Sequence, residues 1–479
     1  MQFVADLHLH SKYSRAVSPR MTLPVMEEYA CKKGLDILTA SDFTHPLWFK
    51  EISSQLEESA EGLYKIKDQI SPPKADQPWA ENDQKNIKFL LSTEISSIYK
   101  QGDKLRRIHN LVFAPNLSVV EKINEALINK GCNLSADGRP IIGLSSKSLL
   151  ELILGIDEDC FLIPCHVWTP HFGIYGSASG FDSLSDAFGD YSKYIYGVET
   201  GLSSDPDMNW SLNELRHRSI LSFSDAHSPE KMGREATVFE LESLAYKNIK
   251  EAIMKPSQLS EFSSQQSVKN DTSLKNIQNR PLKTENRILY TIEFYPEEGK
   301  YHFSGHRNCK VSYDPSEIEM KGTICPVCHK RLTEGVFLRV LQLAGSSLNN
   351  RVQIKHNKVG LKWYTDMHKL QPPYVKLVPL LEIVAESMHA TVASQKVKDM
   401  FFKLCDVFGS ELDVLLKVSM KEIERIGGER IAEGVLRVRE GNIVIIPGFD
   451  GEYGMVSIWK NGEEIIRKKE TESQLTLEF

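Results

Sequence analysis

Residues 2–10, Gln2-Phe3-Val4-Ala5-Asp6-Leu7-His8-Leu9-His10, are the stretch on which the predicted fold depends. The apolar beginning predicts a buried strand, and two histidines stand two residues apart at its end. Because side chains alternate along a strand, both imidazoles point to the same side of the predicted sheet. Two neutral imidazoles on one face suit a divalent cation, although the pair alone fits a structural role equally well.

Short apolar segments, separated by helical patterns, follow this strand. This rhythm is typical of an α/β domain built from βα repeats, in which functional residues gather at the carboxyl ends of the strands. The polar stretch 53–86 interrupts the rhythm, and we expect a helix and an exposed loop there. A helix is expected at 24–33, and strands are expected at 35–39, 88–92, 108–113, 161–167, 195–200 and 220–224.

Side chains that can bind metal follow most of these strands. Since strand ends meet at one rim of a β/α domain, we expect these groups to converge. Imidazoles and carboxylates in this number suit two or three divalent ions, Zn²⁺, Mn²⁺ or Mg²⁺, that hold a phosphate during its displacement. The candidate ligands are His8, His10, Asp42, Glu94, His109, His166, Asp225 and His227.

The order of these residues, His-x-His, Asp, Glu, His, His and Asp-x-His, resembles the PHP phosphoesterase superfamily. The resemblance implies a distorted (β/α)7 barrel over residues 1–255. It also implies a ligand set for each ion: His8, His10, Glu94 and Asp225 for the first, Glu94, His109 and His166 for the second, and Asp42 and His227 in the third.

Two positions depart from the superfamily pattern. Arg15 stands where many PHP proteins have a histidine, and Asp42 is followed by Phe43 where they have an Asp-His pair. His45 either replaces the missing histidine or only hydrogen-bonds nearby. Arg15 either contacts the scissile phosphate, for which its planar guanidinium is suited, or pairs with a ligand carboxylate. The predicted catalytic residues are His8, His10, Glu94, Asp225 and Arg15.

Longer runs resemble a particular branch of the superfamily, the endonuclease Q family of DNA repair enzymes. They lie at 6–14, 41–46, 164–170, 179–184 and 199–206, and with the second half the resemblance covers nearly the whole chain. It implies a hydrolase that cuts damaged single- or double-stranded DNA on the 5′ side of uracil, hypoxanthine or xanthine, and at abasic sites.

An enzyme that inspects a base must take it out of the stack, so aromatic groups near the metals are candidates to receive it. Trp168, His171, Phe172 and Tyr175 follow the ligand His166 directly. The alternative for each is that it only packs the loop.

A second metal site is predicted from His306-x-x-Cys309 and Cys325-x-x-Cys328. Two such pairs form the two halves of one tetrahedral Zn²⁺ site, and because three cysteines and one histidine close the coordination shell, this zinc should be structural. We expect His302 and His329 not to take part. The cations around the site, including Lys310 and Arg331, suit DNA phosphates, while a protein-binding role is the alternative.

The last part of the chain, 346–479, is predicted to be a mostly helical DNA-binding region. Helices are expected at 379–388, 394–408 and 421–438, and strands at 443–447 and 454–459 on either side of a turn at 448–451. Gly427 and Gly428 resemble the hairpin of a helix-hairpin-helix motif, in which backbone N–H groups approach a phosphate. An ordinary helix start after a Gly-Gly turn explains them equally well.

Length and composition fit several globular domains. The 479 residues are 41% hydrophobic, and a Ser-, Gln- and Asn-rich stretch at 256–285 predicts a linker between the catalytic domain and a zinc module at 286–345. The net charge is -6, but residues 300–376 hold 13 Lys and Arg against 5 Asp and Glu, which gives a local +8. We expect a basic patch there, or a solvated charged face.

No stretch is apolar enough for a membrane span, and we expect a cytoplasmic protein with DNA as its partner. A sliding clamp or another repair factor is a further candidate partner. Two alternatives use the same barrel: a small-molecule phosphatase of the histidinol-phosphate type, and a helicase-associated DNA-binding protein without activity.

Overall fold

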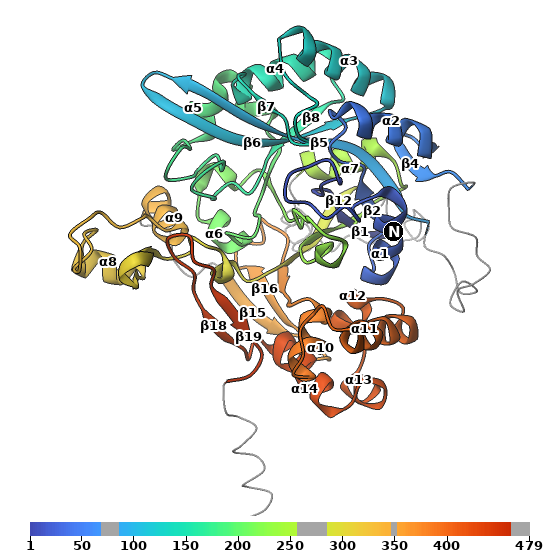
Figure 1. The fold of residues 1–479 in the computed structure, drawn as a ribbon, viewed down its shortest axis with the longest axis vertical. Coiled ribbons are helices and arrows are strands. Elements are labelled where there is room, and N and C mark those ends of the chain that lie inside the picture. The colour runs from blue at the N-terminus through green and yellow to red at the C-terminus, as the bar shows by residue number, and fades with distance from the viewer. Residues whose placement is uncertain (69–85, 256–284, 346–351, 461–479) are drawn as a thin grey trace, which may run out of the picture.

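A computed structural model describes residues 1–68, 86–255, 285–345 and 352–460 (Figure 1). The first strand, β1 (Gln2–Asp6), lies in the middle of a mixed 13-stranded sheet. It pairs in parallel with β2 (Ile37–Thr39) and antiparallel with β11 (Ala236–Glu240), and β2 pairs in parallel with β5 (Lys88–Gln101). The predicted first strand is therefore confirmed, and it ends two residues before His8.

The sheet continues on both sides of these strands. Beyond β5 lie β3 (Leu56–Ala60), β4 (Leu63–Ile66), β6 (Lys104–Ala114), β7 (Ile141–Ile142) and β8 (Phe161–Pro164). Beyond β11 lie β12 (Arg287–Glu293), β17 (Tyr374–Lys376), β16 (Lys362–Asp366) and β15 (Val352–His356). Three small sheets pair β9 (Gly197–Glu199) with β10 (Ser219–Leu221), β13 (Ser304–His306) with β14 (Val311–Tyr313), and β18 (Val444–Ile446) with β19 (Met455–Ser457).

The helices cover this sheet and build a separate cluster at the C-terminal end, where α10 to α14 lie next to α1 (Figure 1). Several begin at a side chain that accepts a hydrogen bond from the first turn, such as Asn116 before α3 and Ser145 before α4. Their bounds are α1 Leu23–Lys33, α2 Pro46–Gln55, α3 Leu117–Asn129, α4 Ser146–Ile156, α5 Leu184–Phe188, α6 Pro206–Trp210, α7 Tyr246–Met254, α8 Pro315–Lys321, α9 Val336–Ala344, α10 Leu380–Ser387, α11 Gln395–Phe408, α12 Glu411–Leu416, α13 Met420–Gly427 and α14 Glu429–Glu440. Among the described residues, every helix is too short or too polar to span a lipid bilayer.

The sheet does not close into the predicted seven-stranded barrel within the described residues. The β9–β10 pair has no ladder to the main sheet, and the outer edge of β11 is occupied by β12. A strand whose second edge is already paired cannot close a ring there. The α/β class is confirmed, whereas the described strand pairs form an open mixed sheet.

Three other expectations need correction. Residues 56–66 form a β-hairpin instead of a loop, because Leu56, Leu63 and Ile66 are buried although the stretch reads as polar. The predicted helix at 421–438 is two helices, since Gly428 has a φ of +87° between α13 and α14. Residues 69–85 of the predicted loop and almost all of the predicted linker lie outside the described residues.

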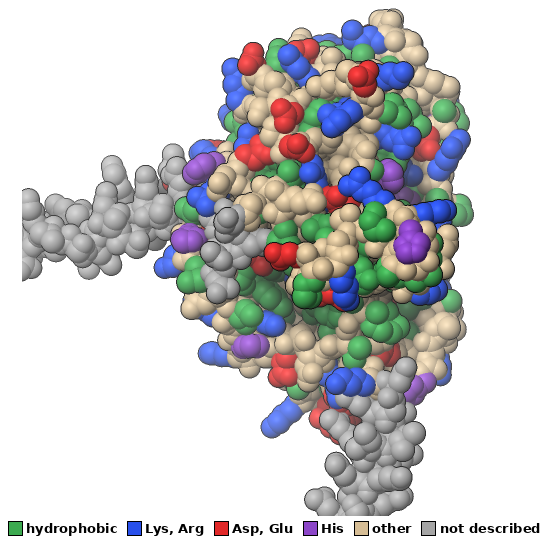
Figure 2. Space-filling view, turned by 90° about the vertical axis from the view of Figure 1, so that its left-hand side faces the viewer, with side chains coloured by type: hydrophobic (Ala, Val, Ile, Leu, Met, Phe, Trp, Pro, Cys, Tyr) green, Lys and Arg blue, Asp and Glu red, His purple; other side chains and the backbone are tan. Residues whose placement is uncertain are grey.

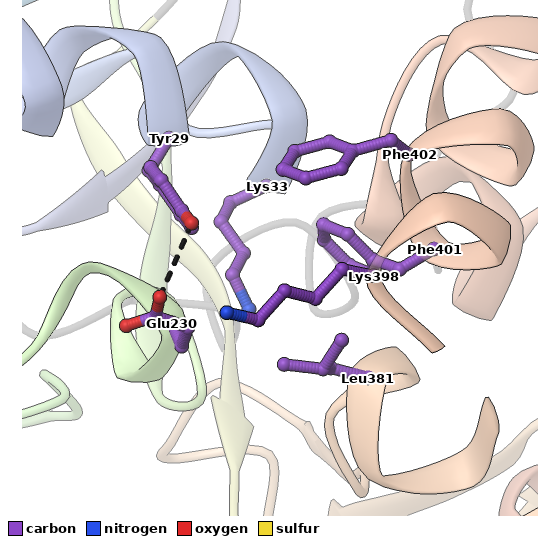
Figure 3. Close-up of a pocket in the computed structure, with 7 residues that line it drawn as sticks. All are labelled: Tyr29, Lys33, Glu230, Leu381, Lys398, Phe401 and Phe402. Carbon is purple, nitrogen blue, oxygen red and sulfur yellow. Dashed lines mark hydrogen bonds between the residues drawn. The ribbon is translucent and has the colours of Figure 1, made fainter. Parts of the chain in front are cut away.

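The helical cluster packs against the N-terminal half of the chain through α1. Lys33 forms an ion pair with Glu411 at 2.6 Å, with both side chains less than a tenth exposed. Figure 3 shows the adjoining crevice, in which Tyr29 and Lys33 of α1 face Phe401 and Phe402 of α11, and Tyr29 is hydrogen-bonded to Glu230. Glu411 also accepts a hydrogen bond from the backbone N–H of Leu380, which starts α10.

We predict that Glu411→Ala lowers the free energy of unfolding by about 3 kcal/mol, because the substitution leaves Lys33 buried without its counter-charge. Urea denaturation followed by circular dichroism measures the change. Lys417→Ala removes an ion pair to Asp413 in which Lys417 is 72% exposed, and it should cost less than about 0.5 kcal/mol. Equal effects of the two substitutions would contradict the structural importance of the α1 contact.

Candidate metal centre

Glu94 in β5 lies at the centre of the predicted ligands. One of its oxygens, Oε1, is 2.5 Å from Nδ1 of His109 and 3.2 Å from Nε2 of His166. The other oxygen, Oε2, is 3.5 Å from Nε2 of His10 and 3.8 Å from Nε2 of His8. The carboxylate thus faces a histidine pair on each side, as a group that bridges two cations would.

Asp225 completes the side nearest to β1. Its Oδ1 is 2.9 Å from Nε2 of His10 and 3.7 Å from Nε2 of His8. Together these side chains form three groups whose ligand atoms lie close enough to share a cation, namely His8, His10 and Glu94; Glu94, His109 and His166; and His10, Asp225 and His227.

The ligand atoms fit metal better than they fit one another. Nε2 of His8 and Oε2 of Glu94 are buried and have no hydrogen-bond partner among the described residues. Two ligands that each lie about 2.1 Å from one tetrahedral ion are roughly 3.4 Å apart, which is close to the observed 3.5 and 3.8 Å separations. The spacing therefore suits a cation between these atoms.

The electrostatics of the site also favour cations. Burial opposes protonation of His10, but hydrogen bonds to Asp225 and Asp42 raise its pKa to about 9. Burial likewise opposes ionisation of Glu94, but His109 and His166 hold its pKa well below the usual value. The carboxylates therefore stay ionised and favour a positive charge among the imidazoles. A bound divalent ion can supply this charge in place of the protons on the histidines.

A carboxylate that sequence analysis did not select, Glu199, positions two of the histidines. It lies at the end of β9 and is fully buried. Its Oε1 is 2.8 Å from Nδ1 of His8, and its Oε2 accepts the backbone N–H of His166. Such a contact fixes which ring nitrogen of His8 faces the centre. Its sequence signals were its place at the end of a predicted strand and at the start of the run 199–206, which resembles the endonuclease Q family.

Asp42 has a similar role toward His10. Its Oδ1 is 3.2 Å from Nδ1 of His10, while Oδ2 accepts hydrogen bonds from the backbone N–H of Ser11 and the hydroxyl of Ser14. These contacts occupy both oxygens, so Asp42 is placed as a partner of His10. Its predicted part in a third ion site stays a prediction.

The backbone at the centre is strained. Asp42, His166 and Asp225 all have positive φ, at 57°, 30° and 47°, a conformation that costs a non-glycine residue about 1–3 kcal/mol. Gly201 allows one of these bends, because a Cβ there would lie 2.3 Å from the Cβ of His166. Strain at three adjacent site residues is typical of a functional centre.

Arg15 and His45 lie apart from the ligands. The side chain of Arg15 is 84% exposed, and its Nε is 3.8 Å from Asp137. Arg139 is nearer, with Nε 3.8 Å from Oε2 of Glu94. His45 precedes α2 and stacks on Tyr13 at 4.5 Å between ring centroids, so it belongs to none of the three ligand groups. Sequence analysis missed Arg139 because it follows a loop without regular periodicity.

The four aromatic candidates after His166 divide into two pairs. Trp168 and Tyr175 are fully buried and tilted against each other at 5.0 Å, with hydrogen bonds to Asn209 and Glu214. These contacts match the packing alternative. His171 is exposed, and Phe172 is half-buried 4.4 Å from the ring of His109.

The cysteine-rich segment forms the second metal group. The ligand atoms of His306, Cys309, Cys325 and Cys328 lie within 4.8 Å of one another. His302 packs on Phe337, and neither it nor His329 belongs to this group. The predicted set of four is thus brought together, on the β13–β14 hairpin and the loop after α8.

The cations around this segment are partly neutralised. Lys310 is 2.6 Å from Glu452, and Lys321 is 2.7 Å from Glu317. On the face drawn in Figure 2, Lys and Arg side chains are interspersed with Asp and Glu. The charge count therefore overstates the basic surface. DNA contacts by Lys310, Arg331, Gly427 and Gly428 stay predictions.

Known proteins share this architecture. Residues 379–442 match the family model of the MJ0043 C-terminal domain. The MJ0043 protein of Methanocaldococcus jannaschii is 28% identical over 326 residues, which are 67% of this chain and 34% of that protein. The chain thus spans about a third of the length of this relative.

Two solved structures match almost from end to end. The lesion-specific endonuclease PfuEndoQ of Pyrococcus furiosus has a TM-score of 0.72 at 27% identity, over 98% of this chain and 99% of that one. An endonuclease Q complex with a 27-mer duplex, with an abasic lesion at the active site, has a TM-score of 0.73 at 28% identity, over 98% of both chains. The chain thus resembles endonuclease Q over nearly its whole length. The resemblance that the sequence motifs indicated is confirmed, and the likeness to endonuclease Q includes the cysteine-rich segment and the helical cluster.

We predict that Glu199→Gln weakens divalent-ion binding about 10- to 100-fold, because an amide has one acceptor oxygen and cannot hold both His8 and the backbone N–H of His166. Calorimetric titration with Mn²⁺ measures the affinity. Glu214→Gln is a matched control, since Glu214 also accepts hydrogen bonds in this half of the chain but lies against Tyr175. Unchanged Mn²⁺ affinity in Glu199→Gln would contradict a positioning role for Glu199.

Proposed function

We propose that this protein is a metal-dependent DNA endonuclease of the PHP superfamily that acts in DNA repair. The observation that carries the proposal is the cluster around Glu94, whose buried ligand atoms are spaced for divalent cations. It is supported by the end-to-end likeness to a lesion-specific endonuclease and to an endonuclease Q bound to a damaged duplex.

The proposed roles of the residues follow from their positions. His8, His10, Glu94, His109, His166, Asp225 and His227 would bind the ions, and Glu199 and Asp42 orient the histidines. Bound divalent ions supply Lewis-acid activation of a phosphodiester and of water. Arg139 lies beside Glu94 with most of its N–H groups not used in hydrogen bonds among the described residues, so it is placed to hold a phosphate oxygen.

The proposed substrate is DNA with a deaminated base or an abasic site, cut on the 5′ side of the lesion. His171 and Phe172 lie at the outer edge of the ligand cluster and are the residues that an extruded base would meet. Trp168 and Tyr175 would support this loop from beneath. The lesion types and the side of the cut come from the family resemblance.

For the cysteine-rich segment we propose a structural Zn²⁺. Three thiolates and one imidazole form a closed tetrahedral shell, which leaves no position for a reacting group. The segment contains only a small apolar cluster around Val311, Ile318 and Leu332, so the ion would supply much of its stability.

Cys309→Ser is predicted to remove one equivalent of zinc from the purified protein and to make residues 300–345 sensitive to protease, because one of four ligands is lost. Metal analysis and limited proteolysis measure both effects. Cys132→Ser, which changes a cysteine outside the cluster, should keep the zinc. Full zinc content in Cys309→Ser would contradict the proposed site.

The proposed activity is tested with 5′-labelled duplexes that carry one central uracil, hypoxanthine, abasic site or normal base, in the presence of Mn²⁺ or Mg²⁺. We expect nicking of the damaged duplexes alone, and Asp225→Ala should abolish it, since Asp225 contacts both histidines that follow β1. Arg139→Ala should slow nicking by about 100-fold or more, as expected when a donor to the developing charge is lost, whereas Arg15→Ala should have little effect.

Two results would count against this function. Equal nicking of the normal duplex would contradict lesion specificity. Rapid hydrolysis of histidinol phosphate without any nicking would favour the small-molecule phosphatase.

A further inference from the structure

The hairpin of β5 and β6 projects from the metal centre. The two strands stay paired in register from Leu91 and Ala114 to Gln101 and Lys104 at the tip. Glu94 and His109 lie in the inner part of this ladder, and the outer part extends beyond the body of the sheet (Figure 1). The hairpin is therefore a ledge that starts at the ligands and runs outward.

One face of the ledge continues the ligand face. Because paired residues lie on one face and alternate along each strand, His109 shares its face with Arg107 two residues further out. Arg107 is paired with Ile98, and Lys100 follows on the same face opposite Leu105. Arg107 also lies near His171, since burial and Arg107 together lower the pKa of that histidine.

The opposite face of the hairpin packs against the loop after β8. Arg106 lies over the ring of Phe181 at 3.8 Å and donates a hydrogen bond to the carbonyl of Gly180. Lys104 lines a polar hollow with Asp182, whose pKa is lowered mainly by the hydrogen bond from Arg339 and also by the charge of Lys104. These contacts hold the hairpin against the loop after β8 and leave the ligand face open.

Within the described part of the chain, the cations on the ligand face have no counter-charge. Among the described residues, neither Arg107 nor Lys100 lies within 4 Å of a carboxylate, and neither side chain has a hydrogen bond. Lys310 and Lys321 near the cysteines, by contrast, each have a carboxylate partner. Arg107 is half-buried, and a partly desolvated guanidinium is stabilised when an anion reaches it.

We infer that Arg107 and Lys100 bind the phosphate backbone of the duplex that flanks the lesion. The inference rests on the proposed endonuclease function and adds to it the path of the DNA. Arg107 lies roughly 6.6 Å and Lys100 roughly 13 Å from His109 along the strands, at about 3.3 Å per residue. At 3.4 Å per nucleotide, 13 Å corresponds to about four base pairs of flanking DNA.

The test compares Arg107→Gln, Lys100→Gln and the double variant with the wild-type protein in nicking and in DNA binding at several salt concentrations. Each lost phosphate contact should make the negative slope of log K against log salt shallower by about 0.9, so the slope of the double variant should be shallower by about 1.8. Lys104→Gln is the matched control, because it removes the same charge from the other face of the same hairpin and should leave the slope unchanged.

Substrates of different length separate a DNA contact from a general loss of structure. The defect of the double variant should be the same for every lesion and should disappear when one flank is shortened to about one base pair, which reaches neither Arg107 nor Lys100. An unchanged salt slope, or a defect that persists on the shortened substrates, would overturn the inference. If the wild-type protein does not nick damaged DNA at all, the proposed function fails, which is a separate outcome.

Discussion

The placement of a carboxylate among imidazoles in the interior is the constraint on which this structure depends. Glu94 is almost fully buried, and an ionised carboxylate in such a place is tolerated only if positive charge surrounds it. Histidines from the segment after β1, from β6 and from the loop after β8 supply part of this positive charge. The strands must therefore be held in a fixed relation, which explains the buried hydrogen bonds of Glu199 and Asp42 behind the ligands. Asp6 adds to them by accepting hydrogen bonds from Ser224 and Gly233, which fixes the loop that carries Asp225.

Much of this centre could be predicted from the sequence, because its ligands follow apolar strands whose ends meet by the rules of α/β folds. Glu199 could not be assigned, since its partner His8 is 191 residues away and its strand has only three residues. Arg139 also lacked a signal, because its position depends on the short strand β7. Arg15 departs from the superfamily pattern, and its planar guanidinium left a phosphate contact or an ion pair with a ligand carboxylate open, but that side chain is turned into solvent.

In the fold too, features that depend on neighbouring residues were easier to predict than features that depend on distant parts of the chain. Strands such as β1 and β5 and helices such as α1, α10 and α11 follow local periodicity and were predicted, whereas α3, α4 and α7 were not. The hairpin at 56–66 was missed because its outward residues, including Glu57, Glu58 and Lys65, mask the buried ones. The open sheet was missed for another reason. Whether a ring of strands closes depends on which strand takes the free edge of β11, and the strand that does so lies beyond residue 285.

The pairing of β11 with β12 has a consequence for how the protein can be divided. The central sheet takes strands from both halves of the chain, so the two halves are not independent folding units. A fragment that stops after α7 would expose the edge of β11. It would also lack Ile292 and Tyr374, so the apolar side chains that these residues cover would be exposed. Unprotected strand edges of this kind invite aggregation. The chain is thus better expressed and engineered whole, and cuts or insertions are best tolerated away from this junction.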